Sequence, residues 1–364
     1  MHITDIRGEY YRWKRAIPIA NGKHVYPYAS LGVVRVETNS GLYGIGYTNT
    51  YFEDRFSECF DYFKAQLLGE DPLNTERLWQ KMWAPKMVGR RGMSTRLISA
   101  IDIALWDIKA KSSGMPLFRL LGGAKDRIPV YAAGGYYAEG KGLDGLQEEV
   151  RQYVNDGCRA VKMKVGAVDM SEDVLRVQAV REAIGPDVKL MVDANCAYSA
   201  VEALRFAGKI ERFNPYWFEE PVEPDDYAGM RMLYEKSAIP VAAGENEYTK
   251  YGFRDLMDQG RVRILNVDVY LSGGVTEFMK IAAFSQAYGG VIAPHGAHTV
   301  HSHLTCAIPN SLILEYYPQR FDDVGQQIYT RQLTLNDDGT VSPPETPGHG
   351  FEPNYEILNT FRLC

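Results

Sequence analysis

The chain has 364 residues, 45% of them hydrophobic and 24% charged, which is the composition of a folded globular protein with a sizeable core. Its formal net charge of −6 and the lack of a basic run argue against nucleic acid or an anionic membrane as partner and favour a small molecule. Five scattered cysteines, no recognisable leader and no apolar run of membrane length predict a reduced, cytoplasmic protein.

The first third of the chain has the pattern of strands followed by helices. Residues 30–48 alternate apolar and polar side chains on both sides of Asn39, Ser40 and Gly41, which predicts a β-hairpin. Residues 94–111 carry an apolar stripe at helical spacing, with Ser94 as the expected N-cap. Residues 1–125 are therefore expected to form an α+β domain.

From about residue 126 the pattern changes to short apolar strands that alternate with amphipathic helices. The predicted strands are residues 130–134, 160–165, 190–194, 216–220, 241–245, 264–269, 291–295 and 312–316. Among the predicted helices are residues 145–155, 172–184 and 275–287. Eight strand and helix units give either a closed parallel barrel or a doubly wound sheet, and the number eight favours the barrel, over residues 126–318.

Charged or titratable side chains recur near the carboxyl ends of these strands, at steps of roughly 20 to 30 residues. They are Lys162, Lys164, Asp193, Glu219, Glu220, Glu245, Asp268, His295 and Glu315. A single acid in such a place is about as often the cap of the next helix. Catalytic groups of α/β barrels gather at this end of the strands, so the recurrence predicts one active site.

Three carboxylates on successive strands, Asp193, Glu219 and Glu245, would repel one another inside a barrel unless a cation lay between them. Ligation by oxygen alone favours a hard ion, Mg²⁺ first, with Mn²⁺ possible. The sequence therefore predicts a metal site made by this acidic triad.

The remaining groups predict a pair of bases around that metal. Lys162 and Lys164 share one face of the second strand, and His295 ends the seventh strand, across the barrel mouth. Like charge from Lys162, burial and the metal are expected to lower the pKa of Lys164 and make it a general base. Asp268 is expected to orient His295. The neighbouring histidines, His298, His301 and His303, are expected to be helix or packing residues.

With these residues in place, the chain resembles the enolase superfamily, specifically its mandelate racemase subgroup. The motifs that carry the likeness are "VKMKV", "VDAN", "FEEP", "GEN", the Asp268 and His295 pair, and Glu315 in "LEYY". The resemblance implies an α/β fold, a modified (β/α)7β TIM barrel with an N-terminal α+β capping domain, and a C-terminal segment, residues 319–364, that returns to the cap. The superfamily uses a lysine or histidine base and an enolate held by Mg²⁺.

The resemblance also implies roles for individual residues. Lys164 would remove the proton beside a metal-held carboxylate, Lys162 would stabilise the enolate, and a protonated Glu315 would donate a hydrogen bond to the substrate carboxylate. Asn195 stands where family members carry an auxiliary polar group. We expect His24 and Tyr26, in the loop expected to set specificity, to bind substrate.

Two reactions remain open for the enolate. Protonation of a departing β-hydroxyl by His295 would make the protein an acid-sugar dehydratase, whereas return of a proton to the same carbon would make it a racemase or epimerase. The run "VYAAGGYYAEGKGL", which resembles tartrate-type dehydratases, and the polar specificity loop favour the dehydratase, whose substrate is a small-molecule carboxylate, an acid sugar. Arg90 and Arg91 could reach a distal carboxylate, although surface arginines are common.

Two other classes are compatible with part of the pattern. A lysine on a barrel strand can form a Schiff base, as in aldolases, and the same scaffold could serve binding alone. The acidic triad argues against the first class, and the matched bases argue against the second. We also expect a homo-oligomer.

Overall fold

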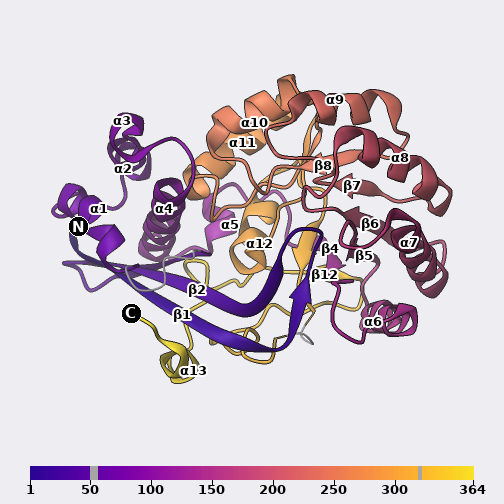
Figure 1. The fold of residues 1–364 in the computed structure, drawn as a ribbon. Helices are drawn as coiled ribbons and strands as arrows, with labels where there is room; N and C mark the ends of the chain where they lie inside the picture. The colour runs from indigo at the N-terminus through magenta and orange to yellow at the C-terminus, as the bar shows by residue number, and fades with distance from the viewer. Residues whose placement is uncertain (50–55, 319–321) are drawn as a thin grey trace.

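The computed structural model describes residues 1–49, 56–318 and 322–364. Within these residues, an antiparallel three-stranded sheet of order β1-β2-β3 stands beside a larger, mainly parallel sheet (Figure 1). The small sheet comprises β1 (Ile3–Ala20), β2 (Val25–Thr38) and β3 (Tyr43–Thr48). The predicted hairpin is confirmed as β2 and β3, with Gly41 at a positive φ of 83° in the turn.

Helices pack on one face of this sheet to form the cap. They are η1 (Glu58–Phe60), α1 (Asp61–Leu67), α2 (Thr75–Met82), α3 (Pro85–Val88) and α4 (Met93–Ser112). The short α5 (Leu117–Leu120) follows them, and its Phe118 belongs to a core cluster with Ile128 and Cys306 in the second part of the chain. The sheet approaches α4 very closely, since a Cβ added at Gly44 or Gly46 would lie 1.9 or 1.8 Å from a carbonyl oxygen of α4. Only glycine fits at these two positions of β3.

The predicted helix at residues 94–111 is confirmed, but its predicted N-cap is wrong. The chain turns at Gly92, whose φ is 88°, and α4 already begins at Met93. Ser94 therefore lies inside the first turn of the helix rather than before it.

The second part of the chain forms the predicted barrel of eight parallel strands. They are β4 (Ile128–Ala133), β5 (Ala160–Lys164), β6 (Lys189–Asp193), β7 (Trp217–Glu219), β8 (Val241–Ala243), β9 (Ile264–Leu265), β10 (Val291–Ile292) and β11 (Leu314–Tyr316). Seven of the described helices connect them: α6 (Leu143–Asn155), α7 (Met170–Ile184), α8 (Ala200–Ile210), α9 (Tyr227–Lys236), α10 (Thr249–Asp258), α11 (Gly274–Ala287) and α12 (His298–Ala307). The one-turn helix η2 (Glu211–Phe213) extends α8. The fold is thus a (β/α)7β barrel with a capping domain.

Backbone hydrogen bonds close the strands into a ring. The ladder runs β10-β9-β8-β7-β6-β5-β4-β11. The ring closes at Ile292 of β10, whose N–H donates to Asn310 O at 3.0 Å and whose carbonyl accepts from Leu312 N at 2.8 Å. The predicted sixth and seventh strands are longer than β9 and β10, because the chain leaves the ladder early there. Asp268 and His295 consequently lie beyond the strands, at the barrel mouth.

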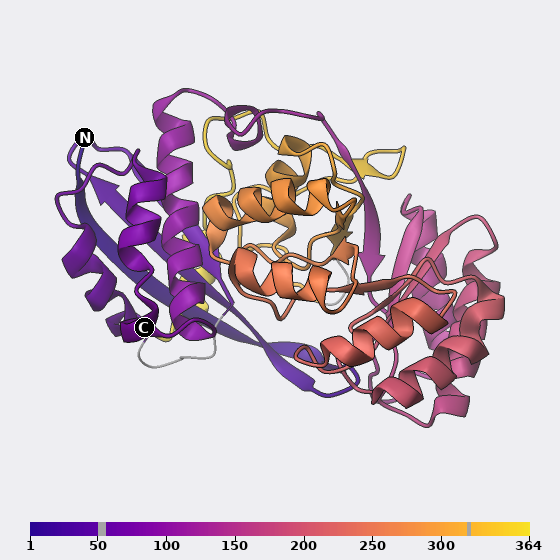
Figure 2. The same ribbon diagram turned by 90° about the horizontal axis from the view of Figure 1, so that it is seen from above.

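The cap and the C-terminal segment meet at the small sheet. Tyr10 of β1 exchanges two backbone hydrogen bonds with the chain end, to Cys364 O at 3.1 Å and from Leu363 N at 2.8 Å. This segment includes β12 (Thr340–Val341), α13 (Tyr355–Leu358) and η3 (Asn359–Phe361). Both termini lie on the cap side of the molecule in the two views (Figures 1 and 2).

The turn between β1 and β2 reaches from the cap to the barrel mouth. Ala20 and Tyr137, which follows β4, exchange backbone hydrogen bonds of 2.8 and 3.0 Å. At the tip of the turn, a Cβ added to Gly22 would lie 2.6 Å from Ala194 O, just past β6. The hairpin is therefore fixed against the strand ends that carry the charged residues. None of the described helices is both long and apolar enough to span a membrane.

A buried polar contact joins α4 of the cap to α11 of the barrel. The carboxylate of Asp102, fully buried, accepts from Thr276 N at 2.8 Å and from Thr276 Oγ1 at 2.6 Å. Burial raises the pKa of Asp102 to about 7, although the hydrogen bonds from Thr276 oppose the rise. This contact fixes the cap helix at the start of α11.

Replacement of Asp102 by alanine should lower the free energy of unfolding by about 2–4 kcal/mol, because both donors of Thr276 lose their buried acceptor. Asp102→Asn, which keeps an acceptor of the same shape, should lose less. Urea unfolding of the two variants and the unchanged protein measures the difference. Equal stability of Asp102→Ala and the unchanged protein would contradict this account of the contact.

The raised pKa of Asp102 also predicts a pH dependence. The folded state holds the proton of Asp102 more tightly than the unfolded state, so this group makes stability fall as pH rises from about 4 to about 7. Asp102→Asn removes the titration. The difference in unfolding free energy between the two proteins should therefore change across this range and be constant above it, as urea titrations at several pH values would measure.

Candidate active site

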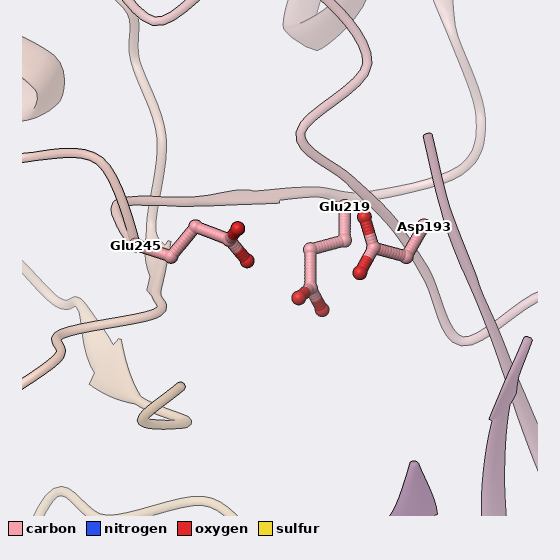
Figure 3. A group of neighbouring side chains, drawn as sticks. All are labelled: Asp193, Glu219 and Glu245. Carbon is pink, nitrogen blue, oxygen red and sulfur yellow. The ribbon is translucent and has the colours of Figure 1, made fainter. Parts of the chain in front are cut away.

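The acidic triad lies at the carboxyl ends of three neighbouring strands. Asp193 and Glu219 are the last residues of β6 and β7, and Glu245 follows β8 by two residues. Each offers one carboxylate oxygen, and the three oxygens lie within 4.8 Å of one another. Figure 3 shows Glu219 between the other two side chains. The structure thus brings together the three residues that the sequence predicted as metal ligands.

The donor atoms of the triad fit a hard divalent cation. Asp193 and Glu219 are fully buried, and Glu245 Oε2 is buried without a hydrogen-bond partner among the described residues. Buried carboxylates without compensation are costly, and oxygen donors at this spacing are the ligands that Mg²⁺ takes in proteins. Asp193, Glu219 and Glu245 would hold the ion.

Lys162 of β5 points into the barrel and binds three acids. Its Nζ lies 2.5 Å from Glu219 Oε1, 2.8 Å from Glu315 Oε1 and 3.3 Å from Asp193 Oδ2. Burial by itself would lower the pKa of Lys162, but Glu219 and Glu315 outweigh it and raise the pKa well above its usual range. Lys162 is therefore a fixed positive charge beneath the triad.

Lys164 lies on the same face of β5, closer to the mouth, and its Nζ lies 2.5 Å from Asp193 Oδ2. The protein groups around Lys164 do not lower its pKa as expected, whereas the effect expected from the metal stays a prediction. Burial acts in that direction, but the attraction of Asp193 exceeds it and raises the pKa of Lys164. Pairing with the adjacent acid outweighs the repulsion from Lys162, because Asp193 is in direct contact.

Glu315 of β11 is an acceptor rather than the expected protonated donor. Its carboxylate accepts from Gly296 N at 2.6 Å and from Lys162. Burial would raise its pKa, but the charges of Lys162, His295 and Lys164 overcome this effect and lower the pKa. The expectation of a protonated Glu315 is therefore wrong, because three cationic groups surround it.

The expected pair of His295 and Asp268 is formed. His295 Nδ1 lies 3.0 Å from Asp268 Oδ2, and His295 Nε2 lies 3.6 Å from Glu245 Oε2 of the triad. Asp268 is held in turn by Tyr270 N at 2.8 Å. Desolvation would lower the pKa of His295, but Glu245 and Asp268 raise it to about 10. Its second ring nitrogen faces the triad.

The three following histidines belong to α12, as expected. His301 is buried, with Nε2 accepting from Val269 N at 3.0 Å, and His303 is buried between Phe118 and His349. Burial lowers the pKa of His301 to about 4 and that of His303 to about 3. Both are packing residues. His298 differs, because it lines the cavity described next.

A cavity of about 470 Å³ connects these groups with the cap. From the barrel it is lined by Lys164, Asn195, Glu245, Asp268 and His295. From the cap it is lined by Trp13, Arg15, Tyr26 and Arg96, among others. Its volume lies in the range of small-molecule sites, and its wall combines aromatic with charged residues.

The three residues expected to bind substrate have different positions. Asn195 lines the cavity, with Nδ2 3.3 Å from Glu245 Oε1. Tyr26 also lines it, and its hydroxyl accepts from Asn21 Nδ2 at 3.0 Å. His24 is exposed, and the structure does not place it among the residues of the cavity wall. Arg90 is exposed, and Arg91 is paired with Asp225 at 2.7 Å, also away from the cavity wall.

Glu220 is a buried residue that the sequence placed at a strand end without a predicted role. Its φ of 42° turns the chain after Glu219, and its carboxylate accepts from Cys196 Sγ, Asn246 Nδ2 and Gly244 N at 2.8, 2.8 and 3.0 Å. Burial and the nearby Glu245 raise the pKa of Glu220 to about 7. It ties together the loops after β6, β7 and β8. The doubled acid in "FEEP" was the signal for it.

An eight-stranded parallel barrel with an acidic triad, two lysines and a histidine and aspartate pair at one end is the arrangement of a metal-dependent barrel enzyme. Residues 145–357 match the family described as enolase C-terminal domain-like, and residues 4–122 match the mandelate racemase and muconate lactonizing enzyme N-terminal domain. The chain belongs to the enolase superfamily, in its mandelate racemase subgroup.

Characterised relatives cover most of the chain. A 3,6-anhydro-alpha-L-galactonate cycloisomerase of Streptomyces coelicolor is 37% identical over 89% of both chains. An arabinonate dehydratase of Saccharolobus solfataricus is 35% identical over 87% of this chain and 86% of its own. An L-talarate/galactarate dehydratase of Salmonella typhimurium is 34% identical over 88% of this chain and 79% of its own.

Solved structures agree with the fold over its whole length. A racemase from Streptomyces coelicolor with bound magnesium has a TM-score of 0.92 and 33% identity, covering 99% of each chain. An L-talarate/galactarate dehydratase liganded with Mg and L-glucarate has a TM-score of 0.90 and 30% identity, covering 99% of this chain and 91% of that one. Bound magnesium in both relatives agrees with the donor set of the triad.

Replacement of Asp193 by asparagine should weaken Mg²⁺ binding at least about tenfold, because one anionic ligand is lost. Calorimetric titration with MgCl₂ measures the affinity, and the rise in melting temperature with Mg²⁺ provides a second measurement that does not depend on turnover. Glu139→Gln, which changes an exposed acid away from the cavity wall, is the matched control. Equal Mg²⁺ affinity of Asp193→Asn and the control would remove Asp193 from the ligand set.

Proposed function

We propose that the protein is a Mg²⁺-dependent acid-sugar dehydratase that forms a 2-keto-3-deoxy acid. The observation that supports the proposal is the cavity lined by Lys164 and His295, with Glu245 of the acidic triad on its wall. Relatives named as arabinonate, L-talarate/galactarate and L-rhamnonate dehydratases, at 31% identity or more, support this substrate class. The proposal includes Mn²⁺ as an alternative metal ion to Mg²⁺.

Removal of the α-proton and loss of water use different residues. A divalent cation at the triad would chelate the substrate carboxylate and stabilise the charge of the enolate. Lys164, once neutral, removes the proton from the carbon beside the carboxylate, and the electrons of the broken C–H bond form the enolate. Lys162 contributes its fixed positive charge to the same centre. Asn195 holds Glu245 in place through its side-chain amide.

His295 completes the elimination from the other side of the cavity. Its Nε2 donates a proton to the β-hydroxyl as the C–O bond breaks, and water leaves. Asp268 holds Nδ1 and stabilises the cation before transfer. The enol product then tautomerises to the 2-keto-3-deoxy acid. Glu315 acts in this scheme as a partner of Lys162 and of the Gly296 N–H.

Racemisation or epimerisation of a 2-hydroxy acid is the second candidate. It uses the same residues, with His295 returning a proton to the carbon that Lys164 deprotonated. The specific observation in its favour is the likeness to the racemase from Streptomyces coelicolor, at 33% identity and a TM-score of 0.92. The polar cavity wall, with Arg15, Tyr26 and Arg96, favours a polyhydroxylated substrate and hence the dehydratase.

Incubation of the Mg²⁺-loaded protein with a panel of monoacid and diacid sugars tests the proposal. The expected product reacts as a 2-keto-3-deoxy acid with semicarbazide. In D₂O, deuterium at the α-carbon of recovered substrate, without any keto acid, would support the racemase instead. Absence of both products across the panel would contradict both candidates.

Substitution of each base should separate the two half-reactions. Lys164→Ala should abolish both α-exchange in D₂O and keto-acid formation, whereas His295→Asn should slow keto-acid formation by about 10²- to 10⁴-fold and keep α-exchange by Lys164. NMR of recovered substrate and the keto-acid assay measure the two steps. Loss of exchange in His295→Asn would assign proton removal to His295 and reverse the roles.

Two expectations from the sequence stay predictions. These are a homo-oligomeric state, which sedimentation would measure, and a cytoplasmic location.

A further inference from the structure

Two arginines bring guanidinium groups to the cap side of the cavity. Arg15 comes from β1 and Arg96 from the first part of α4, and both line the cavity wall. Arg15 belongs to the loop that the sequence predicted to set specificity, whereas Arg96 was not predicted as a site residue. The two arginines have different neighbours, and this difference indicates which class of substrate the cavity binds.

Arg15 already has an anionic partner within the protein. Its Nη1 lies 3.2 Å from Asp322 Oδ2, while Asp322 Oδ1 accepts from Trp13 Nε1 at 2.7 Å and from Gly325 N at 2.9 Å. Asp322 thus joins β1 to the C-terminal segment. Because Asp322 compensates the charge of Arg15, this side chain forms part of the cavity wall and is not the group that we expect to bind an anion.

Among the described residues, the partners of Arg96 are neutral. Its Nη1 donates to the carbonyl of Asn49 at 2.7 Å, and its Nε donates to the Tyr248 hydroxyl at 3.4 Å. No carboxylate of the described residues lies within ion-pair distance of Arg96. The two contacts hold the guanidinium in place, half-buried, and neither of them supplies a negative charge.

The other basic groups of the cavity wall do not share this property. Lys164 is paired with Asp193 and His295 with Asp268. His298 is neutral, since burial lowers its pKa to about 4. Among the described residues of the wall, Arg96 is thus the one cation that lacks an acidic partner, and it belongs to the cap, whereas the proposed chemistry belongs to the barrel.

We propose that Arg96 binds a second carboxylate of the substrate, so that the preferred substrates are diacid sugars rather than monoacids. An oriented guanidinium with free N–H groups matches the two oxygens of a carboxylate. The cavity of about 470 Å³ has room for a six-carbon diacid that reaches from the triad to the cap. The inference rests on the proposed function, because it places the first carboxylate at the triad.

Comparison of matched acids tests the inference. The probes are galactarate with D-galactonate and D-glucarate with D-gluconate, each pair having the same hydroxyl configuration. The Mg²⁺-loaded full chain should favour the diacid in kcat/KM for at least one pair. Arg96→Gln should lower kcat/KM for that diacid by about 10- to 100-fold, mainly through a higher KM. The value of kcat/KM for the monoacid should change by less than about threefold.

Three control variants and a measurement of binding make the result specific. Arg96→Lys keeps the charge but not the fork and should retain part of the preference. Arg90→Gln removes an exposed arginine that does not line the cavity, and it should leave kcat/KM for both acids unchanged. Calorimetry on Lys164→Ala measures the affinity for each acid without turnover. The same measurement on the double variant Lys164→Ala and Arg96→Gln gives the loss of affinity that is due to Arg96.

The outcomes distinguish this inference from the proposed function. An equal loss of kcat/KM for diacid and monoacid in Arg96→Gln would overturn the role of Arg96. The same holds if the unchanged protein shows no preference for the diacid. Tighter binding of a diacid that depends on Arg96, with no keto acid formed from any probe, would support the role of Arg96 and reject the dehydratase. Failure of every acid to bind would overturn both.

Discussion

The ammonium group of Lys162 is the interaction on which the barrel mouth depends. One buried cation contacts acids from β6, β7 and β11, while its own strand is β5, so four of the eight strands converge on a single charge. Each acid would be costly to bury alone, and so would the lysine. Their mutual compensation lets a barrel keep charges inside, and it fixes the height at which each of these strands ends.

The same compensation sorts the charged residues by depth. Lys162, Glu219 and Glu315 compensate one another's charges below the cavity wall. Nearer the cap, Lys164 contacts Asp193, His295 is oriented by Asp268 and also faces Glu245, and both basic residues line the cavity. A group that must exchange a proton needs access to substrate together with one orienting partner, whereas a group that only holds charge needs neither access nor freedom. The structure separates the two kinds along the barrel axis.

Periodicity and residue type sufficed to predict the eight strands, the triad and the His295 pair, because barrel geometry forces strand ends into one ring. Protonation states could not be predicted in this way. The pKa directions of Lys164 and Glu315 depend on which acid or cation lies within about 3 Å, which spacing along the chain does not specify. Arg96 was missed because it is one residue of a helix in the other domain, and Arg90 and Arg91 were the more visible pair. Ser94 was misplaced because Gly92 could start the helix earlier.

The placement of Arg96 follows from how the cap is held. Asp102 lies six residues further along α4 and fixes this helix to α11 through Thr276, while Gly44 and Gly46 let β3 pack directly against it. A helix fixed to the barrel on one side and to the cap sheet on the other holds the side chains of its first turns at a fixed position over the mouth. Specificity groups on the cap and reactive groups on the barrel therefore share one rigid frame, and a change on the cap can alter what is bound without moving the residues proposed to react.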